Sequence, residues 1–161
     1  MLILLPPSEG KTRPSAGHPL DLESLSFPSL TPARAQLLRS LVKLCAGNPE
    51  RAMQVLGLAP TQSEAITVNA GLAAEPSARA DEIYTGVLFS TFELASLDAT
   101  ARGRADESLA IASALFGLVR PGDRIPAYRL SGDGSLPRLA ARVGRKNHSA
   151  ICDLLGGSRH G

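Results

Sequence analysis

The sequence predicts a single domain of mixed α/β (α+β) class, with a central mixed sheet flanked by short helices. Two apolar runs indicate the sheet: residues 1–5 and residues 109–119, each long enough for one buried strand. Between these runs, helix start and stop signals recur at short intervals. At 161 residues the chain has room for one domain with a real core.

The elements follow from local signals. Thr31-Pro32 begins a helix through residue 46, and Gly47 ends it. Asn48-Pro49 begins a second short helix that closes at Gly57, and Thr61 begins a third. Residues 81–88 are expected to be extended with a turn at Gly86, and residues 89–97 to be helical. Residues 127–130 are expected to form a last strand.

Composition narrows the class of protein. The chain is 43% hydrophobic and 20% charged, as is usual for globular proteins. Two cysteines are too few for a disulfide framework or a zinc site, and no histidine has a partner at ligand spacing, so we expect no metal and no cofactor. Without a signal peptide or a membrane span, the expected location is the cytoplasm, with no membrane partner.

The charge is unevenly distributed along the chain. Residues 1–119 carry 9 Lys/Arg against 12 Asp/Glu, whereas residues 120–161 carry 8 against 3. A basic C-terminal part suggests an anionic partner such as nucleic acid, and a solvated arginine-rich surface explains it equally well.

The loop after the first strand is the strongest candidate site. Gly10-Lys11-Thr12 matches the end of the P-loop motif, but Leu5 occupies the position of its first glycine and a Pro-rich loop replaces the helix that should follow. A phosphate loop of the ATP-binding type is therefore excluded. Lys11 follows the first apolar run and Arg120 the second. If those strands are parallel neighbours, Lys11 and Arg120 converge, joined by Arg129 from the next strand, whereas antiparallel pairing would separate them.

Four blocks, in this order, carry a family resemblance: LLPPSEGK at residues 4–11, YTGV at 84–87, ALFGLVRP at 114–121 and YRL at 128–130. Together they resemble the bacterial YaaA family of peroxide stress response proteins. The resemblance implies an α/β domain with a helix-hairpin-helix-like element and a basic cleft that binds double-stranded DNA. It implies Lys11, Arg120 and Arg129 as DNA- or anion-binding residues. Ser8, Glu9, Tyr84 and Thr85 would line the cleft, and no catalytic residue can be transferred.

The resemblance covers residues 1–139, and residues 140–161 are expected to be a divergent tail that can be disordered. Because members of that family are longer, the sequence suggests a truncated or frame-shifted reading frame, with a natural short variant as the alternative. The sheet would then be incomplete relative to the family.

The leading hypothesis is a DNA-binding protein of the oxidative stress response, not an enzyme. Two alternatives stay open: an enzyme acting on a nucleotide or another phosphorylated small molecule at a pocket formed by Ser8, Glu9, Lys11 and Tyr84, and a non-functional truncated fragment. Protein partners cannot be named.

Overall fold

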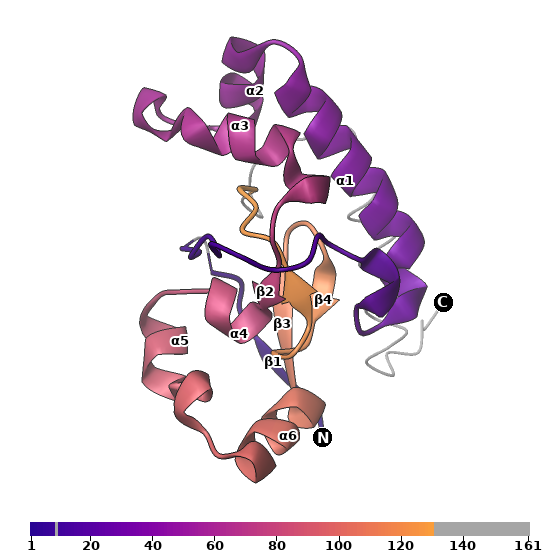
Figure 1. Ribbon diagram of the computed structural model, residues 1–161, viewed down its shortest axis with the longest axis vertical. Coiled ribbons are helices and arrows are strands. Elements are labelled where there is room, and N and C mark those ends of the chain that lie inside the picture. Colours follow the sequence, from indigo (N-terminus) through magenta and orange to yellow (C-terminus); the bar gives the residue numbers. More distant parts are fainter. Residues whose placement is uncertain (9, 131–161) are drawn as a thin grey trace, which may run out of the picture.

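The computed structural model describes residues 1–8 and 10–130 of the chain. The predicted mixed α/β class is confirmed: small sheets lie in the middle of the molecule, with α1–α3 toward one end and α4–α6 toward the other (Figure 1). The predicted boundary at residue 139 and the tail at residues 140–161 lie outside the described residues.

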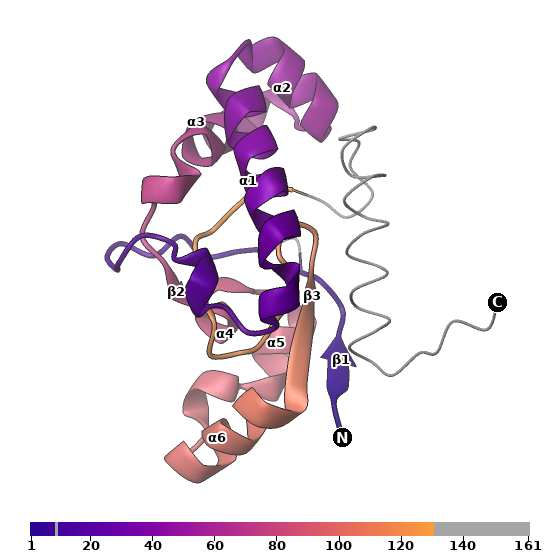
Figure 2. The same cartoon turned by 90° about the vertical axis from the view of Figure 1, so that its right-hand side faces the viewer.

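The first sheet has three strands in the order β1-β3-β4. Strand β1 (Ile3–Leu5) runs parallel to β3 (Leu109–Ser113), and the two lie side by side in Figure 2. Strand β4 (Gly117–Val119) pairs antiparallel with β3. A second sheet pairs β2 (Ala78–Arg79) antiparallel with β5 (Arg124–Ile125).

The apolar run at residues 109–119 is a hairpin, not the single central strand that was expected. The turn is possible because Gly117 has a φ of 74° and because the Ser113 hydroxyl accepts a hydrogen bond of 3.0 Å from the amide of Phe116. Both arms are buried, so the run has the continuous apolar composition of one long strand. The hairpin reverses the chain before Arg120, which decides where that residue lies.

The predicted helices at residues 31–70 are confirmed as α1 (Thr31–Ala46), α2 (Pro49–Leu56) and α3 (Glu64–Ala70). Asn48 caps α2 by accepting a hydrogen bond of 2.9 Å from the amide of Arg51. Gly57 ends α2 with a φ of 64°, a conformation that favours glycine. Helices α2 and α3 thus form a helical hairpin that packs on α1.

Three further helices follow: α4 (Ala80–Ile83), α5 (Val87–Phe92) and α6 (Ala99–Ser108). Short 3-10 helices occupy Leu22–Ser24, Pro28–Leu30, Pro60–Gln62, Leu72–Ala74 and Leu94–Ser96. The expected extended segment at residues 81–88 is wrong at both ends, because α4 occupies it up to Ile83 and α5 begins at Val87. None of the described helices has the length and apolar character needed to cross a bilayer.

The expected strand at residues 127–130 is also absent. Pro126 has no amide proton to offer a neighbouring strand. The side chain of Asn69, from α3, accepts from the amide of Arg129 at 3.0 Å and donates to its carbonyl at 2.8 Å. A side chain therefore takes the place of a neighbouring strand there.

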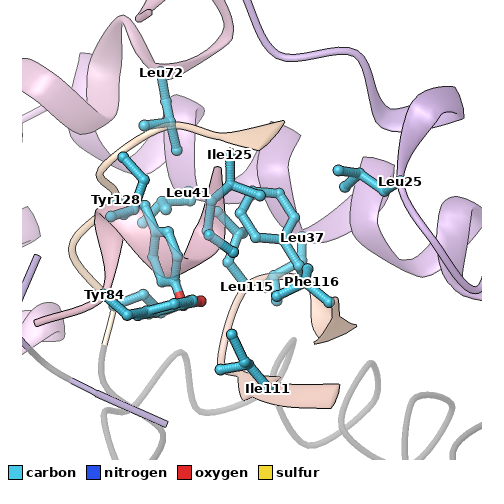
Figure 3. Packing of buried hydrophobic residues seen from close by; sticks show 14 of the residues in the cluster. Leu25, Leu37, Leu41, Leu72, Tyr84, Ile111, Leu115, Phe116, Ile125 and Tyr128 are labelled. Carbon is cyan, nitrogen blue, oxygen red and sulfur yellow. The ribbon is translucent and has the colours of Figure 1, made fainter. Parts of the chain in front are cut away.

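The core lies between α1, the β3–β4 hairpin and the segments around Tyr84 and Tyr128 (Figure 3). Helix α1 buries Leu37, Leu41 and Cys45, which recur at helical spacing on one face. The same face buries Arg34 completely.

Candidate functional site

The structure brings together two of the sequence blocks, the loop after β1 and the segment after α4. Lys11 pairs with Tyr84 in an isolated antiparallel bridge. The amide of Thr85 donates to the carbonyl of Gly10 at 2.9 Å. Four predicted cleft residues, Ser8, Lys11, Tyr84 and Thr85, are therefore neighbours, whereas Glu9 lies outside the described residues.

The two segments approach each other closely because glycines stand at the contacts. A Cβ at Gly10 would lie 2.6 Å from the Thr85 hydroxyl, and one at Gly86 would lie 3.2 Å from the Ser8 hydroxyl. The Ser8 hydroxyl donates to the carbonyl of Thr85. Its proton therefore helps to fix the loop, which is a positioning role and not that of an activated nucleophile.

The ammonium group of Lys11 is held in place by polar and aromatic contacts. Its Nζ donates to the carbonyl of Ser8 at 3.0 Å. It also lies 4.4 Å from the ring centroid of Tyr128 and 5.5 Å from that of Tyr84. Cation–π attraction and the hydrogen bond favour this position, so the positive charge is set on an aromatic floor.

The floor is a buried hydroxyl network. The hydroxyl oxygens of Tyr84 and Tyr128 lie 2.8 Å apart, and the Ser113 hydroxyl lies 2.7 Å from that of Tyr128. Figure 3 shows the two tyrosine hydroxyls pointing toward each other. Burial raises the pKa of both tyrosines, so both phenols are neutral at neutral pH. Neither Tyr128 nor Ser113 was among the predicted site residues. The signal for Tyr128 was its place in the YRL block, while Ser113 had no signal beyond its place inside an apolar run.

Arg120 does not join Lys11, because β4 runs antiparallel to β3 and therefore also to β1. The side chain of Arg120 instead reaches the C-terminal turn of α6, where it donates to the carbonyls of Asp106 at 3.0 Å and Glu107 at 2.6 Å. Its guanidinium carbon lies 5.0 Å from the ring centroid of Phe27. The expected convergence of Lys11 and Arg120 is therefore wrong, and these contacts give Arg120 a structural role.

Arg129 lies on the Lys11 side of the molecule. It directly follows Tyr128, whose ring supports Lys11, and Asn69 of α3 holds its backbone. Of the three cations predicted to form the site, Lys11 and the backbone of Arg129 thus both lie near Tyr128.

A pocket of about 260 Å³ opens beside the Lys11 loop. Its walls are Pro6, Pro7 and Ser8 on one side and the segment from Thr85 to Phe89 on the other. The first wall belongs to the block at residues 4–11, and the second wall begins in the block at residues 84–87 and continues to Phe89. Among the described residues, no group of three His, Cys, Asp or Glu side chains is placed to hold a metal ion.

The two ends of the molecule differ in charge. Residues 31–70, which form α1–α3, contain four Lys/Arg and two Glu. Residues 80–108, which form α4–α6, contain two Arg and six Asp/Glu. Arg129 is bonded through its backbone to α3 at the basic end and Arg120 is anchored to α6 at the acidic end. Lys11 lies between the two ends, paired with Tyr84 directly after α4.

Comparison with known proteins identifies the family. A family model described as "Peroxide stress protein YaaA" matches residues 1–147. A UPF0246 protein of Streptomyces coelicolor is 50% identical to this chain over 141 residues, covering 88% of this chain and 54% of the relative. A UPF0246 protein of Corynebacterium efficiens is 43% identical over 164 residues, covering 98% of this chain and 62% of the relative. This chain spans less than two thirds of the length of these two relatives. On the match over residues 1–147, this chain belongs to the peroxide stress protein YaaA family.

Proposed function

We propose that this chain serves the peroxide stress response by binding duplex DNA through phosphate contacts at its basic end. The observation that carries the proposal is the fixed ammonium of Lys11, set on the Tyr84–Tyr128 floor, with Arg129 following Tyr128 in the chain. Cations already held in position lose little conformational freedom when a phosphate binds.

The distribution of charge also favours the binding of DNA at the basic end of the molecule. The outer surface of α1 exposes Arg39 and Lys43, four residues apart and so on one face of the helix, and α2 exposes Arg51. The acidic residues of α4–α6 would repel the phosphate backbone. DNA would therefore lie mainly across the α1–α3 end, reach Arg129 and extend to the Lys11 loop in the middle of the molecule, and Arg120 would take no part.

The helical hairpin of α2 and α3 adds a second support. Its turn at Gly57 and Ala59 is exposed, and the resemblance implies a helix-hairpin-helix-like element in this family. Such contacts to the backbone position DNA without reading its sequence. We therefore expect similar affinity for duplexes of different sequence.

The test is the affinity for a short duplex, measured by fluorescence anisotropy at several salt concentrations. Arg129→Ala should weaken binding several-fold and reduce the salt dependence by about one phosphate contact. Arg104→Ala is the matched control, because Arg104 is an exposed arginine of α6 at the acidic end. Affinity that does not change with salt, or equal losses in both variants, would contradict the proposal.

One observation favours a second candidate function, the binding of a small phosphorylated molecule. The 260 Å³ pocket lies next to the Lys11 loop and is closed on two sides by fixed backbone. Calorimetric titration with nucleoside monophosphates distinguishes the two. Saturable binding of such a molecule by a chain with no affinity for duplex DNA would favour the second function.

A further inference from the structure

The pocket beside the Lys11 loop has a mostly apolar lining. Pro6, Pro7 and Val87 present apolar surface, and Phe89 closes the interior side. Its volume of about 260 Å³ is below the range from roughly 300 Å³ upward that is typical of drug-sized ligands. The pocket therefore suits one heterocyclic ring system and is too small for a base pair.

The walls of the pocket are fixed before any ligand arrives. The hydrogen bond from Thr85 to Gly10 and that from Ser8 to Thr85 join the two walls at their base. Gly86 has a φ of 118°, which a residue with a side chain rarely adopts, and it brings the backbone close to Ser8. A site with fixed walls holds a ring without an ordering cost.

Val87 is the unusual residue at this place. It lines the pocket, yet the residue is 86% exposed, on the first turn of α5 directly after Gly86. Proteins that distort DNA insert apolar side chains between base steps, where the side chain replaces stacking contacts that the duplex loses. Val87 both lines the pocket and is exposed to solvent, so a base that entered the pocket would leave its stacking position close to this side chain.

We propose that the pocket receives a single unpaired base turned out of a DNA duplex, with Val87 filling the space that the base leaves. This inference rests on the proposed function, because only a duplex that is already bound can present such a base to the pocket. An unpaired base costs less to extrude than a paired one, so the site selects duplexes that contain one. Contacts to the phosphates alone would give no such preference.

The test compares two duplexes of identical length with the full chain. In one, the fluorescent base 2-aminopurine stands opposite an abasic position; in the other, it is paired with thymine. We expect about tenfold tighter binding of the first duplex, with a rise in fluorescence as the base leaves the stack. Val87→Ala should reduce the preference at least threefold and leave the affinity for the paired duplex unchanged. Phe92→Ala, an exposed apolar residue at the other end of α5, is the matched control and should change neither.

The outcomes separate this inference from the function on which it rests. Salt-dependent binding of both duplexes with equal affinity would overturn the base pocket and leave the DNA-binding proposal standing. No binding of either duplex would overturn both. An unchanged preference in Val87→Ala would overturn the role of Val87. A preference that free deoxynucleoside monophosphate abolishes by competition, while the paired duplex stays bound, would confirm that the base enters the pocket.

Discussion

The α1–α3 end and the α4–α6 end of this molecule are joined to the same small sheet but differ in charge. The first carries an excess of cations, several of them exposed on helix surfaces, and the second carries an excess of carboxylates. The same residue type therefore has different roles at the two ends. Arg129 at the basic end is a candidate phosphate contact, whereas Arg120 at the acidic end is bonded to helix carbonyls.

Contacts inside the molecule hold the basic end to the sheet. Arg34 of α1 is fully buried and donates to the carbonyls of Phe116 at 2.9 Å and Leu118 at 2.6 Å, in the β3–β4 hairpin. It also donates to the carbonyl of Ser26 at 2.7 Å. Burial lowers the pKa of Arg34 to about 10, which still leaves it protonated at neutral pH. Helix α1 is therefore joined to the sheet by a buried cation.

The largest loss of stability is expected when the hydrogen bonds from Arg34 to the β3–β4 hairpin are removed. Arg34→Met removes the donor from two buried carbonyls of the β3–β4 hairpin and from the partly buried carbonyl of Ser26. We expect the free energy of unfolding to fall by about 3–5 kcal/mol. Arg39→Met is the matched control on the exposed face of α1 and should cost less than about 0.5 kcal/mol. Urea unfolding followed by circular dichroism measures both. Equal losses would show that Arg34 contributes no more than a surface arginine.

A smaller effect is expected at the loop that carries the site. Lys11→Met removes the hydrogen bond to the Ser8 carbonyl and the contact with the Tyr128 ring, at a cost of about 1–2 kcal/mol in the free energy of unfolding. Lys43→Met replaces an exposed lysine of α1 and should leave stability nearly unchanged. A loss of stability confined to Lys43→Met would contradict the fixed position of the Lys11 ammonium.

The comparison of the two ends is tested directly by charge reversal. Arg39→Glu in α1 should weaken duplex DNA binding by about 1 kcal/mol, roughly fivefold, because a cation near the phosphates becomes an anion. Arg104→Glu in α6 makes the same change at the acidic end and should alter affinity by less than twofold. Anisotropy at low salt measures both variants. A larger loss in Arg104→Glu would place the DNA on the opposite end.

The fold class and the helices of the α1–α3 end were predictable because each has a local signal. Thr31-Pro32, Asn48 and Gly57 mark helix ends through their own backbone and capping chemistry. The convergence of Lys11 and Arg120 was predicted wrongly because it depended on whether residues 109–119 form one strand or a hairpin. A fully buried hairpin and a fully buried strand have the same apolar composition, so periodicity cannot distinguish them. The last predicted strand failed for another reason: Asn69, 60 residues away, supplies the hydrogen bonds of Arg129.

Ionisation of the Tyr84–Tyr128 floor does not affect the free energy of unfolding at neutral pH but lowers it in alkali. The chain has two tyrosines and no tryptophan, so the ultraviolet absorbance of tyrosinate reports these two residues alone. In an unfolded chain both would ionise near pH 10, but burial raises the pKa of each in the folded state. Above about pH 10 the folded chain therefore holds more protons than the unfolded chain, and the free energy of unfolding falls as the pH rises. Below that pH both states are protonated and the tyrosines contribute no pH dependence.

We expect tyrosinate to appear in one cooperative step together with the loss of the circular dichroism signal. Gradual ionisation near pH 10 with the fold intact would show that the floor beneath Lys11 is open to water.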